Sequence, residues 1–276
     1  MSSMVRPQRS VISPLAWLAA ALAGIAAPTL AMVMLADAPA PLVFFGGPIL
    51  SLGLMGSGMI AAAIAARLWV GIALALLTAA GLVLLAGALG MSLLPHPVST
   101  VLAFAIAGFS FAARGKLFAR SAADKGWWIA LFVVAGEAAM LLTAAAMPGA
   151  LPDWLLVLLP AQWASMAIQT ALTGTGTRAA SSALIALAGT GAVTLLVARL
   201  WPRRWPYALM FSAWLGLSAL VWHRPAPPMP APTPPNAQSE QRLMQPSVGI
   251  AQAHAAAEPS VPVVRGGRAI ALPPAD

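Results

Sequence analysis

Long apolar runs, separated by short polar or proline-containing segments, recur along the chain as far as Arg224. Most are close to the 20 or so residues that a helix needs to cross the hydrocarbon core of a bilayer. Apolar residues make up 60% of the 276 and charged residues only 8%, which is too few to cover the surface of a soluble domain. Because backbone polar groups must be paired locally in lipid, the runs predict an all-α integral membrane protein.

The breakers between the runs divide the chain into a polytopic helical bundle of about eight transmembrane helices. The predicted spans are residues 11–36, 42–66, 69–93, 98–113, 127–147, 154–173, 180–199 and 205–222. They form a transmembrane helical domain at 11–224, preceded by a cytoplasmic N-terminal segment at 1–10. The remaining segment, 225–276, is rich in proline and small polar residues, so we expect a disordered tail.

Basic residues set the expected orientation. With a cytoplasmic N-terminus, most of them fall on the cytoplasmic side of eight spans, as the positive-inside rule requires, but Arg199, Arg203 and Arg204 do not. If 154–173 were a re-entrant segment, seven spans would remain and these three would become cytoplasmic, while Arg178 and Arg224 would move outside. Re-entrant backbone needs shielding by protein or a cavity, so we predict eight spans and keep seven as the alternative. Preference for arginine over lysine favours a bacterial cytoplasmic membrane.

Glu137 is the one acidic residue within the predicted span 127–147, and it lies near its centre. An unpaired carboxylate facing lipid at that depth is costly, so Glu137 is expected to face protein or water, or to be protonated. The following connection is short, which predicts that the next helix returns antiparallel beside it. Counting depth across this turn at 1.5 Å per residue places Glu137 level with about Trp163.

The returning segment carries a polar stripe at that depth. Gln162, Ser165, Gln169 and Thr173 follow the spacing i, i+3, i+7 and i+11, which places them on one helix face. One hypothesis is that Glu137, Gln162, Ser165 and Gln169 line a pathway or site for a solute, lipid or proton. The alternative is that the same side chains only join two helices through hydrogen bonds of about 1 kcal/mol each.

Four basic residues gather between the fourth and fifth predicted spans. They are Arg114, Lys116, Arg120 and Lys125, opposed by a single acid, Asp124. Such a cluster beside a membrane attracts anionic headgroups, which makes these residues candidates for contact with membrane lipids. The alternative is a loop that only sets topology.

Small residues and tryptophans indicate how the spans pack. Gly53, Ser57, Ala61 and Ala65 recur at four-residue spacing, as do Ser182, Ala186, Thr190 and Thr194, and such faces let helices approach closely. Most tryptophans lie at span ends, where indole favours the interface. Trp17, Trp163 and Trp214 lie inside spans, where we expect them to serve packing.

Recognisable catalytic chemistry is missing from the sequence. It has no cysteine and no HExxH motif, and its few acids outside the tail are isolated, so we expect no metal or cofactor. The basic residues are scattered, which argues against binding nucleic acid. Two functions of different class are left: a transporter or permease-like protein using Glu137, or a non-catalytic membrane scaffold that binds a membrane-protein partner or a second copy. A membrane enzyme is less favoured.

Overall fold

The computed structural model describes residues 14–36, 42–90, 96–173, 180–203 and 205–223, and the regular structure of these residues is all helical. This confirms the all-helical part of the predicted fold class. The N-terminal segment 1–10 and the tail 225–276 lie outside the described residues.

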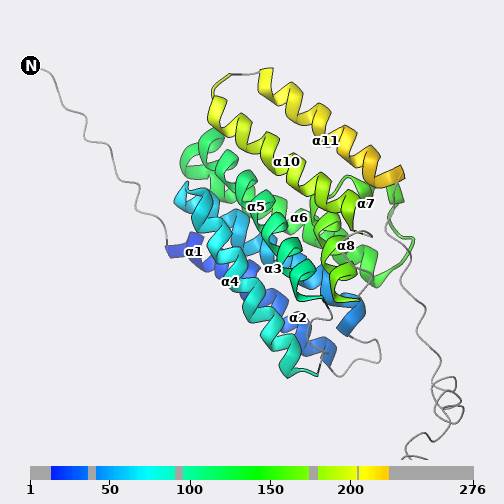
Figure 1. The fold of residues 1–276 in the computed structure, drawn as a ribbon. Helices are drawn as coiled ribbons and strands as arrows, with labels where there is room; N and C mark the ends of the chain where they lie inside the picture. The colour runs from blue at the N-terminus through cyan, green and yellow to red at the C-terminus, as the bar shows by residue number, and fades with distance from the viewer. Residues whose placement is uncertain (1–13, 37–41, 91–95, 174–179, 204, 224–276) are drawn as a thin grey trace, which may run out of the picture. The chain divides into compact units, whose positions relative to one another are not determined.

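The described residues form twelve helical elements, which Figure 1 draws in chain order. They are α1 (Pro14–Ala21), the π-helix η1 (Leu22–Ala26), α2 (Ala27–Ala36), α3 (Leu42–Ala65), α4 (Leu68–Ala88), α5 (Pro97–Ala122), the 3₁₀ turn η2 (Ala123–Lys125), α6 (Gly126–Ala146), α7 (Asp153–Val157), α8 (Pro160–Leu172), α10 (Ser181–Leu200) and α11 (Trp205–His223).

Six helical stretches among the described residues are long and apolar enough to cross a membrane: Pro14–Ala36, Phe45–Ala65, Leu68–Ala88, Pro97–Ala146, Ser181–Leu200 and Trp205–His223. The stretch of 50 residues, Pro97–Ala146, is not one straight helix. It divides at Ala123, whose φ of 47° lies in the left-handed region. Beyond this point Gly126 packs against the backbone of Phe118, so α6 folds back along α5. These two helices have 26 and 21 residues, and each is therefore long enough to cross on its own.

The continuous helix expected over 154–173 is broken into α7, of 5 residues, and α8, of 13. Pro160 occupies the first turn of α8, where its missing N–H does no harm, whereas inside a continuous helix its ring would clash with the preceding turn. The helix α8 is about 20 Å long, shorter than the hydrocarbon core of a bilayer. The predicted count of eight spans is therefore not confirmed.

The fourth predicted span ended too early. The prediction stopped at residue 113, before the first basic residue, but α5 continues to Ala122 and includes Arg114, Lys116 and Arg120. Lysine and arginine are good helix formers and can extend their charged ends away from apolar surroundings, so charge alone does not end a helix.

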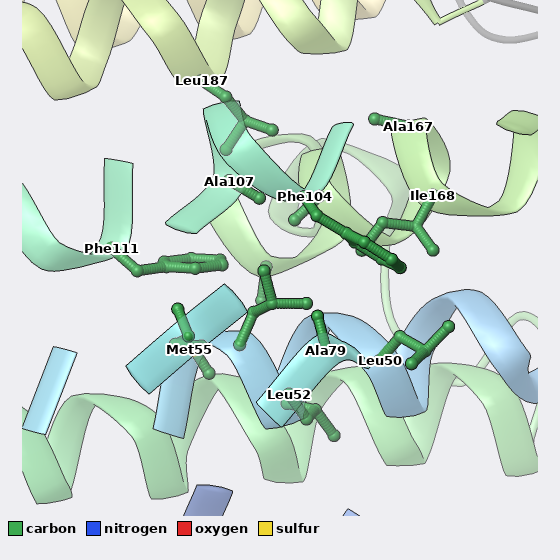
Figure 2. Close-up of a cluster of buried hydrophobic side chains, with 14 of the residues drawn as sticks. Leu50, Leu52, Met55, Ala79, Phe104, Ala107, Phe111, Ala167, Ile168 and Leu187 are labelled. Atoms are coloured by element: carbon green, nitrogen blue, oxygen red, sulfur yellow. The ribbon is translucent and has the colours of Figure 1, made fainter. Parts of the chain in front are cut away.

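Helix α3 lies at the centre of the bundle and packs against α1, α2, α4, α5, α6 and α8. Figure 2 shows part of this core, in which Phe104 and Phe111 of α5 and Ile168 of α8 point toward the same buried space as Leu50 and Met55 of α3. Peripheral helices instead expose large apolar side chains, as a lipid-facing surface would: Leu77, Leu84 and Phe132.

Small residues bring α3 close to its neighbours. A Cβ added at Gly71 of α4 would lie 2.5 Å from the Gly58 carbonyl oxygen, and one added at Gly115 of α5 would overlap the carbonyl of Met59. The predicted α3 face also packs closely, since a Cβ on Gly24 of η1 would meet the backbone of Ser57 at 2.6 Å. The second predicted stripe is buried on α10, which packs against α5, α8 and α11.

Candidate functional site

The break between α7 and α8 releases backbone groups that a continuous helix would have paired. Side chains from three helices now pair them. The indole Nε1 of Trp163 donates to the Val157 carbonyl at 2.7 Å, and the indole Nε1 of Trp214, on α11, donates to the Leu158 carbonyl at 3.2 Å. Because an unpaired carbonyl is costly in an apolar interior, these two tryptophans stabilise the break in addition to packing around it.

Glu137 pairs the other side of the break. Its Oε2 accepts a hydrogen bond of 2.9 Å from the backbone N–H of Ala161. Pro160 has no N–H, so Ala161 carries the first donor that the start of α8 presents. The partial positive charge at a helix N-terminus favours a carboxylate at this position. Glu137 of α6 therefore caps the N-terminus of α8.

Arg114 lies near Glu137 but is poorly satisfied. Its Nη2 lies 3.5 Å from the Thr190 hydroxyl on α10, a long hydrogen bond, and its guanidinium stands 5.8 Å from the ring centre of Phe111. Its Nη1 is buried and has no hydrogen-bond partner among the described residues. Arginine carries five N–H donors and no acceptor, so this site holds a buried donor in need of an acceptor.

The turn at Ala123 brings Arg114 and Glu137 to one level. Arg114 precedes the turn by 9 residues, and Glu137 lies 11 residues beyond Gly126 at the start of α6. At 1.5 Å per residue both lie about 15 Å from the turn on antiparallel helices. Within the described residues the two groups interact electrostatically without forming a direct ion pair.

Both charged side chains line one cavity of about 410 Å³, together with residues of the α7–α8 break, α10 and α11. Its walls are otherwise mainly apolar and include Leu117, Phe118, Val133, Leu158, Met210 and Phe211. Sites for small organic molecules commonly have this character: a concave apolar lining with a few polar groups.

The predicted polar stripe lies elsewhere. Gln169 faces α3, where its Oε1 accepts a hydrogen bond of 2.8 Å from the Gly47 N–H, next to the proline within that helix. Ser165 is buried, and its backbone oxygen borders the same glycine. Gln162 is half-buried, and the cavity lining does not include any of these three residues. Depth counting reached Trp163, two residues from Ala161, where the contact is made.

The four basic residues proposed for lipid contact separate into two environments. Arg114 lines the cavity, whereas Lys116 is half-buried and Arg120 and Lys125 are exposed. The Arg120 Nε donates to the Ala198 carbonyl of α10 at 3.4 Å. Lys125 ends the turn after α5, and the first turn of α6 carries the stacked rings of Trp127 and Trp128.

The sequence predicts Arg114 as a candidate for lipid contact in a connection, and it does not predict its place in the cavity that Glu137 lines. Counting depth backward from Glu137, across the turn at Ala123, identifies Arg114 at the same level. In the described part of the chain, no three His, Cys, Asp or Glu residues gather as metal ligands would. The chain matches no family model, no curated protein and no solved structure.

Proposed function

We propose that this chain is a permease-like membrane protein that binds a small amphipathic solute in the cavity between Arg114 and Glu137. One observation carries the proposal: two opposite charges line an apolar cavity among the helices, yet no direct ion pair joins them in the described residues. Charges of this kind are costly in a membrane protein and mark substrate pathways more often than packing sites. About 410 Å³ is enough for a small organic molecule.

The broken helix supports the same proposal. Transporters commonly bind their substrates where a discontinuous helix ends near the middle of the membrane, because the broken ends present unpaired backbone groups and partial charges. Here the break between α7 and α8 borders the cavity through Leu158, Leu159 and Pro160. The comparison is one of physical arrangement and implies no shared ancestry.

For topology we propose seven spans, with α7 and α8 as a re-entrant segment and the N-terminus in the cytoplasm of a bacterial cell. In this order Arg199 and Arg203 face the cytoplasm together with Arg120 and Lys125, as the positive-inside rule requires. Helix α8 is largely buried against α3, α5 and α10, which provides the shielding that re-entrant backbone needs. Lys116, Arg120 and Lys125 would then meet anionic headgroups of the inner leaflet.

A second function, a non-catalytic membrane scaffold, has one observation in its favour. The hydrogen bond from Ala161 to Glu137 already gives the carboxylate a structural task. In a scaffold the cavity would be a packing defect, closed to water and to solutes. Access to the cavity therefore separates the two functions.

The chain has no cysteine, so a single introduced thiol reports on its own position without background. Thr194→Cys places a thiol of nearly the same size in the cavity wall, whereas Ala186→Cys places one on the same α10 face, where the side chain is buried outside the cavity. In membrane vesicles we expect a small water-soluble methanethiosulfonate to modify residue 194 and spare residue 186. Protection of both thiols in the folded protein would overturn the proposed function and favour the scaffold.

A further inference from the structure

The two charges in the cavity are unequally satisfied. Glu137 has a 2.9 Å hydrogen bond from Ala161 and lies at the positive end of α8. Arg114 has one long hydrogen bond and a ring contact, and its Nη1 lacks a partner among the described residues. A ligand in this cavity would therefore be expected to supply a hydrogen-bond acceptor to Arg114.

Resting on the proposed function, we propose that the solute is an anionic amphiphile: one carboxylate or phosphate group that binds Arg114, with an apolar body that fills the rest of the cavity. A guanidinium is planar and matches the geometry of both anions with two parallel hydrogen bonds. The apolar body would contact the walls formed by Val133, Met210 and Phe211.

A cationic or zwitterionic solute fits less well. Its positive group would have to approach Glu137, whose Oε2 accepts from Ala161 and whose charge is already partly balanced by the positive end of α8 and by Arg114. The same two positive groups would repel an added cation. An anion is attracted by both of them.

Thr190 is a positioning residue in this arrangement. Its hydroxyl donates to the Ala186 carbonyl at 2.7 Å, which leaves the oxygen lone pairs to accept from Arg114 Nη2. The contact holds one edge of the guanidinium against α10 and leaves Nη1 free to donate to a solute. Replacing Thr190 by valine would keep the shape of the wall and release the arginine.

The test measures protection of the thiol in Thr194→Cys by three probes with equal chains and different head groups: octanoate, octylammonium and octanol, at neutral pH. The purified full chain is held in nanodiscs of phosphatidylcholine. We expect octanoate to slow modification in a saturable manner and the other two to have little effect. Equal protection by octylammonium would overturn the inference, as would equal protection by octanol.

Arginine variants locate the effect. Arg114→Gln in the Thr194→Cys background should weaken octanoate protection roughly tenfold or more, whereas Arg114→Lys, which keeps a cation, should retain part of it. Arg199→Gln removes an exposed base on α10 and is the matched control. If Arg114→Gln fails to fold, Thr190→Val provides the test through a smaller loss. Octanoate protection that is independent of both residues would contradict the proposed site.

Changing the lipid composition of the nanodiscs distinguishes two possible sources of the anion. If an anionic headgroup is the natural occupant, nanodiscs containing phosphatidylglycerol should protect the thiol without octanoate, and Arg114→Gln should abolish that protection. If the occupant is a free solute, added octanoate should be required in both compositions. A thiol at 194 that no reagent reaches defeats the proposed function, whereas a reachable thiol without anion selectivity defeats this inference alone.

Discussion

The two sides of α5 differ in how they pack. On one side, α3 and α4 approach so closely that a methyl group added at Gly71 or Gly115 would meet backbone. On the other side, Gly191 of α10 comes close to the Ser110 backbone, but α6, α10, α11 and the α7–α8 break still leave a cavity beside Arg114. Gly136 of α6 and Gly216 of α11 are exposed and have no atom within 4 Å of an added Cβ. In lipid no hydrophobic force drives helices together, so close packing must come from small residues that face each other. Glycine alone does not produce it.

Polar groups differ between the two sides as well. In α3 the hydroxyls of Ser51 and Ser57 donate to carbonyls of their own helix, Pro48 and Gly53, and so contribute little to joining helices. Around the cavity, Glu137 and Trp214 bind backbone groups of other segments. The first side should therefore be sensitive to added volume, and the second to the loss of a single hydrogen bond.

The largest effect should come from overfilling the close-packed side. Gly115→Ala forces a methyl group into the Met59 carbonyl, and because both partners are helix backbone, the helices must move apart. We expect a loss of about 3 kcal/mol in the free energy of unfolding. Gly81→Ala, on α4 with open space around it, is the control and should not destabilise the protein. Unfolding in mixed micelles measures both, and equal stability of the two variants would contradict the close packing.

A smaller loss is expected on the cavity side from Trp163→Phe. The ring keeps most of its buried volume, but the Val157 carbonyl loses its donor at the broken helix. We expect a cost of about 2 kcal/mol, which combines an unpaired buried carbonyl with a small void. The same measurement on Trp69→Phe, where the indole is 63% exposed, should give little change. Equal, small effects at the two positions would mean that the hydrogen bond from Trp163 does not stabilise the break.

Sequence patterns predicted the helical class well because the length of an apolar run can be counted directly in the sequence, as in Leu68–Ala88. They predicted the broken segment poorly. Residues 154–173 are as apolar as a span, and only Pro160 indicates that the helix restarts there. Arg114 lies within α5 because this helix continues past it to Ala122. The local composition does not show how far the helix continues beyond this first charged residue. Gln169 of the polar stripe faces α3, where it pairs with Gly47, a residue far away in sequence. Counting residues across one turn cannot identify such a partner.

Replacing Glu137 by glutamine should change stability little and binding more. An amide oxygen can still accept from the Ala161 N–H, so we expect a loss under about 1 kcal/mol, from the weaker interaction with the helix dipole. Glu137→Ala, which leaves that N–H unpaired, should cost about 2 kcal/mol. If Arg114 anchors an anion, Glu137→Gln removes a repelling charge, and octanoate should protect a thiol at 194 at lower concentration. A higher required concentration would mean that Glu137 itself anchors the solute.

The smallest effect on stability should come from three exposed positions that report topology: Lys125→Cys, Asp153→Cys and Arg203→Cys. With seven spans, residues 125 and 203 share the cytoplasmic side and 153 lies opposite, whereas eight spans would place 203 with 153. We therefore expect an impermeant maleimide to label 153 in intact cells, and 125 and 203 only after lysis. Labelling of 203 in intact cells would require the segment around α8 to cross the membrane. The hydrogen bonds that Trp163 and Trp214 donate and Glu137 accepts pair the backbone at the break from within the protein. Helix α8 has 13 residues and covers only about 20 Å, less than the hydrocarbon core of a bilayer, and this is why we expect it to enter and leave on the same side.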